Sequence, residues 1–224
     1  MRNELIPPLL GYYTMAGGAA PVATPWYLSG GVSASDCVGA YKAKGAASLA
    51  ASKVNLANPG TYDLSSTADP TFDTTTGWYF ISGKHLQTGI TPTSTYSFVG
   101  RLNGVEVSNW RSLGGLWSVA NGKYNIAWNG SNWYISVGGS DVNSTSTATS
   151  GVFAIVNRYL YVDAVKKTSQ ASAAANSLTF SMGAPTADAG YGTNCVEYCL
   201  AFALYSSVLT EEQLLAITTA MNAL

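Results

Sequence analysis

Charged side chains are scarce in this sequence. They make up 10% of its 224 residues, and 11 Lys and Arg nearly balance 12 Asp and Glu, giving a formal net charge of -1. Proteins bind a nucleic-acid backbone through clustered basic side chains, whereas the Lys and Arg here are scattered. Nucleic acid is therefore excluded as a partner. The sequence also lacks an apolar run long enough to cross a membrane, so no membrane partner is expected.

Cysteine is rare as well, and its number is odd. The three cysteines are Cys37, Cys195 and Cys199, which argues against a disulfide framework. If Cys195 and Cys199 lie on one strand, they are about 13 Å apart at ~3.3 Å per residue, too far to form a bridge. A bridge from Cys37 to either of them stays open. The favoured interpretation is that all three are small, buried apolar side chains.

What the chain does contain is Ser, Thr, Asn and Gly, with 12% aromatic residues. This composition is typical of a turn-rich β protein. The stretch from Gly77 to Arg101 predicts two strands joined by a glycine turn, and in Tyr96–Val99 bulky and small side chains alternate. The clearest hairpin spans residues 124–137, where large apolar residues alternate on both sides of Asn129-Gly130-Ser131-Asn132. The fold class predicted is an all-β antiparallel sandwich.

Helices are expected only near the two ends of this sandwich. Ser33 or Ser35 is predicted to cap a short Ala-rich helix through Tyr41, and Ala46–Ala51 suits a second short turn of helix. Near the C-terminus, Thr210 and Gln213 form a capping box that opens an amphipathic helix. Residues 1–25 are predicted to be an extended N-terminal arm, and 26–224 a single domain.

The remaining strands and loops follow from shorter patterns. Strands are predicted at 152–156, 158–162 and 178–182, and long exposed loops at 138–150 and 183–192. The last strand, 196–205, places large side chains such as Phe202 on one face, with Cys199 and other small residues on the opposite face.

Four stretches of the chain resemble the concanavalin A-like lectin/glucanase superfamily, in the laminin-G-like form found in bacteriophage virion proteins and bacterial surface proteins. They are GWYFISGKHLQTGI, TYSFVGRL, RYLYVDAVKKTS and CVEYCLAFALYSSVLTEEQLLAIT. The resemblance implies a jelly-roll fold. It departs from the family at Ala164, where a turn glycine is usual.

The resemblance also implies a function. It suggests a non-enzymatic phage or phage-like virion surface protein, in a fibre, tail or head decoration, with a lectin-like domain for adhesion to glycans or a host surface. In that hypothesis the arm at 1–25 anchors the protein to other virion subunits or to copies of itself, and the location is the virion surface or extracellular. The alternative is a purely structural virion subunit that binds no glycan.

Catalysis is disfavoured by the carboxylates. A retaining glycosidase needs two carboxyl groups about 5 Å apart, and the glutamates are Glu4, Glu106, Glu197, Glu211 and Glu212. Neither Glu106 nor Glu197 has a carboxylate neighbour at that spacing in sequence, although two distant strands could bring a pair together. His85, which is the one histidine, lies at a predicted turn, so a catalytic triad is not expected.

Sugar binding needs aromatic rings for the apolar faces of the sugar and fixed polar partners for its hydroxyl groups. The rings could instead be structural, since Trp128 and Trp133 could form a cross-strand pair. No cofactor is expected, although a calcium ion held by Asp69, Asp73 or Asp188 is possible. The candidate sugar-binding residues are Trp110, Trp117, Trp133, Tyr134, Asp188, Tyr191 and Asn194, with Asn109 and Asn132 beside them.

Overall fold

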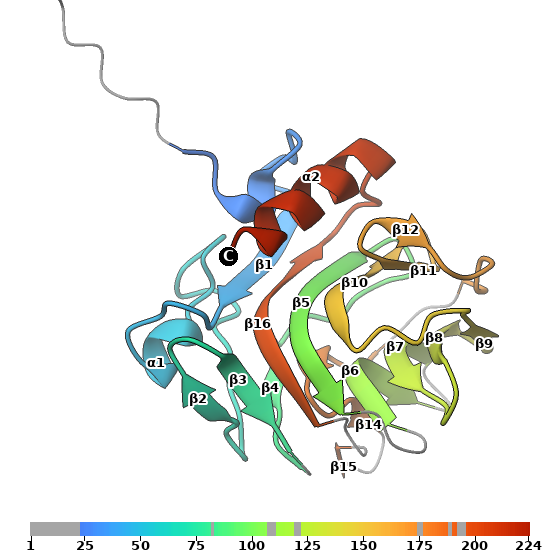
Figure 1. Ribbon diagram of the computed structural model, residues 1–224, viewed down its shortest axis with the longest axis horizontal. Helices are drawn as coiled ribbons and strands as arrows, with labels where there is room; N and C mark the ends of the chain where they lie inside the picture. The colour runs from blue at the N-terminus through green and yellow to red at the C-terminus, as the bar shows by residue number, and fades with distance from the viewer. Residues whose placement is uncertain are drawn as a thin grey trace, which may run out of the picture.

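The computed structural model describes residues 23–81, 83–106, 111–118, 122–173, 177–187, 190–191 and 196–224, with the backbone alone at 190–191 and 196–197. Within these ranges the chain forms two β-sheets packed face to face, with one longer helix on the outside (Figure 1). The predicted all-β antiparallel sandwich is confirmed. One described pair, β14 with β6, is parallel. The predicted arm at 1–25 lies almost entirely outside the described residues, so the domain boundary stays a prediction.

The first sheet, as far as it is described, has the strand order β12-β11-β10-β5-β16-β3-β2, and β1 also pairs with β16. Its centre is the long pair β5 and β16. β10, from the middle of the chain, pairs with β5, and β1 and β3, from the N-terminal part, pair with β16. The strands are β1 (Cys37–Lys42), β2 (Thr71–Asp73), β3 (Gly77–Phe80), β5 (Ser97–Glu106), β10 (Ser150–Val156), β11 (Tyr159–Val162), β12 (Val165–Lys166) and β16 (Val196–Tyr205).

The second sheet, over the same described ranges, has the order β15-β14-β6-β7-β8-β9, with β13 pairing both β6 and β4. Its centre is the predicted hairpin, which is confirmed in register, with Trp128 opposite Trp133. The strands are β4 (Leu86–Gln87), β6 (Arg111–Ser118), β7 (Gly122–Trp128), β8 (Trp133–Gly138), β9 (Ser140–Asn143), β13 (Ser181–Met182), β14 (Thr186–Ala187) and β15 (Gly190–Tyr191).

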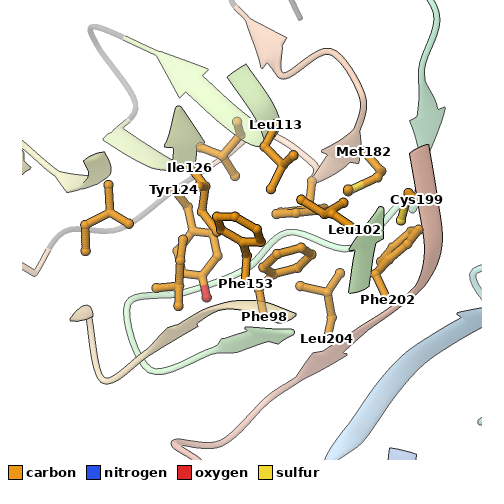
Figure 2. Close-up of a cluster of buried hydrophobic side chains, with 14 of the residues drawn as sticks. Phe98, Leu102, Leu113, Tyr124, Ile126, Phe153, Met182, Cys199, Phe202 and Leu204 are labelled. Atoms are coloured by element: carbon orange, nitrogen blue, oxygen red, sulfur yellow. The ribbon is translucent and has the colours of Figure 1, made fainter. Parts of the chain in front are cut away.

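The main core lies between the two sheets. Figure 2 shows side chains from β5, β10 and β16 of the first sheet meeting side chains from β6, β7 and β13 of the second. Aromatic pairs link the layers, such as Trp133 with Phe153 at 5.1 Å between ring centroids. The labelled residues are Phe98, Leu102, Leu113, Tyr124, Ile126, Phe153, Met182, Cys199, Phe202 and Leu204.

The C-terminal helix α2 (Glu211–Asn222) covers the outward face of the first sheet. The predicted capping box is confirmed, because Thr210 Oγ1 accepts from Gln213 N at 3.2 Å and Gln213 Oε1 accepts from Thr210 N at 2.9 Å. Leu214 and Ile217 are buried in a second apolar cluster with residues of β1, β5, β10 and β16. The short 3-10 turn η1 (Trp26–Leu28) lies against the same helix (Figure 1).

The predicted helix from Ser33 or Ser35 to Tyr41 is wrong. Residues 37–42 instead form strand β1, which pairs with the free edge of β16. The Ala-rich local pattern favours a helix only weakly, and the tertiary pairing overrides it. The second predicted helical turn is present as α1 (Leu49–Ser52), which begins at Ser48, whose Oγ accepts from Ala51 N at 3.1 Å.

The face predicted for Cys199 is also wrong. β16 has irregular register on either side of this residue, between Glu197 and Cys199 and between Cys199 and Ala201. Each irregularity interrupts the strict two-residue alternation of a strand. Cys199 therefore lies in the core with Phe202 instead of opposite to it. Among the described residues, Cys37 and Cys199 are both buried and form no disulfide with each other; Cys195 lies outside the description.

Two loop predictions need correction as well. The segment 138–150 contains β9, and the segment 183–192 contains β14 and β15. These strands are two to four residues long, and their Ser, Thr and Gly content hides them in sequence because such residues are also typical of turns. The strand predicted at 178–182 is reduced to Ser181–Met182.

Burial of one thiol and several tyrosine hydroxyl groups makes the stability of the fold sensitive to alkali. Burial raises the pKa of Cys37 to about 12 from its ordinary 9.0, and it also raises the pKa values of Tyr41, Tyr124 and Tyr205 above the ordinary 10.0. The folded state thus binds protons that the unfolded chain releases, so stability is complete below about pH 9 and falls as the pH rises toward 12. We expect urea-unfolding midpoints that decline steadily from pH 9 to 11. Equal midpoints at pH 8 and pH 11 would contradict this.

Candidate functional site

The outward face of the second sheet carries a set of polar and aromatic side chains, which we call the polar face. They come from β6 to β9 and β13, and each alternates with a residue of the main core. The strand register places them in rows across the sheet. The set comprises Ser112, Trp117, Lys123, Asn125, Tyr134, Ser136, Asp141, Asn143 and Ser181.

The central row runs straight across five strands. Ser181 is opposite Gly115, Gly115 opposite Asn125, Asn125 opposite Ser136, and Ser136 opposite Asp141. Gly115 has φ 138°, and a Cβ there would lie 2.2 Å from the Tyr124 carbonyl oxygen. A side chain at this position would clash with the backbone of β7, so the row requires glycine here. The sheet surface at Gly115 therefore carries no side chain.

Hydrogen bonding within the central row is incomplete. Asn125 is 1% exposed, and its Oδ1 accepts from the hydroxyl of Ser112. Ser136 is 0% exposed, and its Oγ has no hydrogen-bond partner among the described residues. A buried hydroxyl without a partner is destabilising by about 1–3 kcal/mol, so its presence calls for an explanation.

Two aromatic rings flank this central row. Trp117 lies on one side of it and is half-buried, while Tyr134 lies on the other side and is 5% exposed. Trp117 pairs with Lys123 and Tyr134 with Ala127, four positions further along β7. The two positions are thus separated by about 13 Å along the strands.

One ion pair lies beside Trp117. Lys123 Nζ is 4.0 Å from the centroid of the Trp117 ring, and it is 3.1 Å from Asp141 Oδ1 and 3.4 Å from Oδ2. The lysine side chain is 17% exposed and the aspartate side chain 50% exposed. The cation is held by a ring on one side and a carboxylate on the other, which restricts the position of the tryptophan.

The structure separates the sugar-binding residues predicted from sequence. It places Trp117 and Tyr134 on the same polar face, on opposite sides of the central row. Trp133, however, points into the core, where it is fully buried and its Nε1 donates to the Ala148 carbonyl at 2.7 Å. Its ring meets Trp128 at 5.5 Å, edge to face. Trp133 is therefore a structural residue, and the prediction of a sugar contact there is wrong.

Most of the other predicted site residues lie outside the described residues or are described by their backbone alone. Trp110, Asp188 and Asn194 lie outside the described residues, as does Asn109. Tyr191 is described by its backbone alone, opposite Thr186 in the pair of β15 with β14. Asn132 lies in the β7–β8 turn, where its N–H donates to Asn129 Oδ1 at 2.9 Å.

Sequence reasoning missed Lys123, Asn125, Ser136 and Asp141. A signal was available, because Lys123, Asn125 and Ala127 fill the alternate positions between Tyr124, Ile126 and Trp128. In a half-buried strand the positions opposite the core form a second face. The apolar positions of this strand predict the core, and the polar positions between them predict the second face.

A metal site receives no support from the described residues, which contain no group of three or more His, Cys, Asp and Glu able to hold an ion. Asp69 forms an ion pair with Lys53, whose hydrogen bond lowers the pKa of that carboxyl. Asp73 Oδ1 accepts from Thr76 N at 2.9 Å, and this bond lowers its pKa. Both carboxylates thus have local partners, and Asp188 lies outside the description.

His85 is a buried, hydrogen-bonded residue next to a turn. Its Nδ1 lies 3.1 Å from the Gly83 carbonyl and its Nε2 lies 3.4 Å from Thr67 Oγ1. These contacts are those of a residue that joins two loops of the fold.

The two strand glutamates occupy neighbouring positions of the first sheet. Glu106 is opposite Val196, and Glu197 is opposite Val105. These are successive pairs of one ladder, and successive pairs belong to opposite faces of a sheet. The backbone therefore does not favour a carboxylate pair from these residues.

Comparisons with known proteins concern the fold. No family model matches the sequence, and no curated protein matches it either. Among solved structures, the fold is similar to Trypanosoma rangeli sialidase in complex with 2,3-difluorosialic acid (TM-score 0.61, 13% identity) and with sialic acid (TM-score 0.60, 14% identity). Each match covers 84% of this chain and 33% of the sialidase, so the chain spans about a third of those proteins.

Another similar structure is that of one domain of a larger enzyme. Domain 4 of AbnA, a GH43 extracellular arabinanase from Geobacillus stearothermophilus, in complex with arabinotriose, has a TM-score of 0.55 at 12% identity. The match covers 82% of this chain and 98% of that domain. At these identities the comparisons establish the β-sandwich fold.

These structures overturn the function predicted from sequence. The similar proteins are sialidases and an arabinanase domain, which indicate a fold used in glycan processing or glycan binding. The prediction of a phage or phage-like virion surface protein is therefore wrong, and virion subunits find no support as partners. The described residues contain no helix long and apolar enough to cross a membrane.

Proposed function

We propose that this chain is a carbohydrate-binding module without catalytic activity of its own, concanavalin A-like in fold, which binds glycans on its polar face. The observation that carries the proposal is the unpartnered, buried hydroxyl of Ser136 in a row of polar side chains between Trp117 and Tyr134. The domain of an extracellular arabinanase, solved with arabinotriose and matched over nearly its whole length, supports the assignment. It also favours an extracellular location.

The chemistry of the polar face suits a sugar. A sugar ring has apolar C–H faces that stack on aromatic rings, and hydroxyl groups that need both donors and acceptors. Serine hydroxyls and the asparagine amide supply both kinds of group. The polar face holds these groups in a row between two aromatic rings, of which Trp117 is the more exposed.

The absence of catalysis rests on the carboxylates. Hydrolysis by a retaining or inverting mechanism uses two carboxyl groups on either side of the bond. Among the described strands β6 to β9, the one carboxylate is Asp141, and it is paired with Lys123. A binding role requires no second carboxylate.

Replacing Ser136 with alanine tests the proposal. Because the hydroxyl has no partner in the described part of the chain, its removal is expected to leave stability unchanged or raise it by about 1 kcal/mol. If a glycan uses the hydroxyl, affinity falls about fivefold to tenfold. Glycan-array screening of the wild-type protein identifies a ligand, and calorimetry then compares the two proteins.

The matched control is Thr218→Val. Thr218 Oγ1 is also buried and finds no partner in the ranges that the structure describes, but it lies on α2, which packs on the first sheet. This substitution is expected to leave affinity unchanged. A folded wild-type protein that binds no glycan would refute the proposed function, and equal affinities for Ser136→Ala and wild type would exclude the polar face as the site.

A further inference from the structure

The charges on the polar face are few and already paired. Lys123 is the cation that the register places there, and its Nζ contacts both carboxylate oxygens of Asp141, at 3.1 and 3.4 Å. The same atom lies 4.0 Å from the centroid of the Trp117 ring. The ammonium group therefore has an anionic partner and an aromatic partner at once.

No other cation of the described second sheet shares this surface. Arg111, in β6, is opposite Trp128, whose side chain belongs to the core, so it occupies the inward-facing series of positions. The remaining Lys and Arg of the described residues lie outside β6 to β9. The internal segments beyond the description, 107–110, 119–121, 174–176, 188–189 and 192–195, contain no Lys, Arg or His, and neither does residue 82.

An acidic sugar would meet an unfavourable surface here. Carboxylate groups are recognised by cations that are free to form charge-assisted hydrogen bonds. Lys123 could turn to such a group only by leaving Asp141, which would then stand as a like charge beside the ligand. Placing like charges together is a general means of rejecting a wrong ligand.

We infer that the polar face selects neutral glycans, and that Asp141 is the residue that excludes sugars carrying a carboxylate. This inference rests on the proposed function and specifies its ligand class. The wild-type protein binds neutral oligosaccharides at least about tenfold more tightly than counterparts that carry a sialic or uronic acid.

The experiment uses Asp141→Asn. This change keeps the size of the side chain and leaves the charge of Lys123 unopposed. The ratio of the affinity for the acidic glycan to that for its neutral counterpart is therefore expected to rise about tenfold. The gain should shrink in 0.5 M salt, because charges at an exposed site are screened. Adding Lys123→Met to Asp141→Asn is expected to abolish it.

The control variant is Glu106→Gln. It changes the net charge by the same amount, but at the exposed end of β5 in the first sheet, so acidic glycans should gain nothing from it. The measurement is a glycan array with each neutral oligosaccharide beside its acidic counterpart, followed by calorimetry. Circular dichroism verifies that each variant is folded.

The outcomes separate the two proposals. Wild-type protein that prefers acidic glycans, or an Asp141→Asn variant that gains no acidic binding, overturns the selectivity while the module remains a glycan binder. A folded wild-type protein that binds neither class overturns the proposed function and the selectivity with it.

Discussion

Replacing Trp133 with alanine is expected to lower the free energy of unfolding by about 3–5 kcal/mol. The side chain is fully buried and packs edge to face against Trp128 and Phe153. Its removal leaves a cavity between the sheets, and the Ala148 carbonyl loses its donor. A domain of this kind is stable by roughly 5–15 kcal/mol, so partial unfolding at 37 °C is expected. Urea unfolding followed by tryptophan fluorescence measures the loss.

The matched variant is Trp117→Ala. This tryptophan is half-buried on the polar face and contacts the Lys123 ammonium, so the loss of stability is expected to be about 1 kcal/mol or less. Glycan affinity should nevertheless fall about tenfold or more. Similar losses of stability in both variants would mean that Trp117 is a core residue and not part of the polar face.

Replacing Asn55 with alanine is expected to destabilise the protein by about 3 kcal/mol. Asn55 is 0% exposed. Its Oδ1 accepts from Ala40 N at 3.0 Å and Ala57 N at 3.1 Å, and its Nδ2 donates to Val38 O at 3.0 Å and Thr61 O at 2.8 Å. Truncation leaves several buried backbone groups without partners, each costing about 1–3 kcal/mol before water or relaxation compensates.

The control for this prediction is Asn58→Ala, in the same loop and exposed. Its effect should stay within about 0.5 kcal/mol. Thermal unfolding by differential scanning calorimetry compares the variants. If Asn55→Ala unfolds at the same temperature as Asn58→Ala, the hydrogen-bond network does not hold β1 to the following loop.

The parts of the fold that sequence predicts well are those with local signals. The capping box at Thr210 and Gln213 fixes the start of α2, and the alternation around Trp128 and Trp133 fixes the central hairpin, because each pattern lies within a few residues. β1 shows the opposite case. Its partner β16 is more than 150 positions away, and a pairing across that distance leaves no trace in the local composition.

The candidate site was harder to predict than the fold for a related reason. Trp117 and Trp133 are alike in sequence, since both stand in strands among polar and apolar neighbours. Which of them faces the core depends on the register between strands, and a shift of one residue exchanges the two faces. The aromatic content therefore predicted which residue types a sugar site would use. Only the register shows that Trp133 packs in the core and that Trp117 lies on the polar face.

The position of α2 bears on how the protein can be attached to a support or fused to another chain. Both described ends belong to one side of the molecule, because Trp26 and Leu224 pack with the helix on the outward face of the first sheet (Figure 1). The polar face belongs to the opposite sheet. A biotin tag or a fused enzyme joined after Leu224 would consequently be attached on the side of the molecule away from the polar face, which leaves that face directed toward solution.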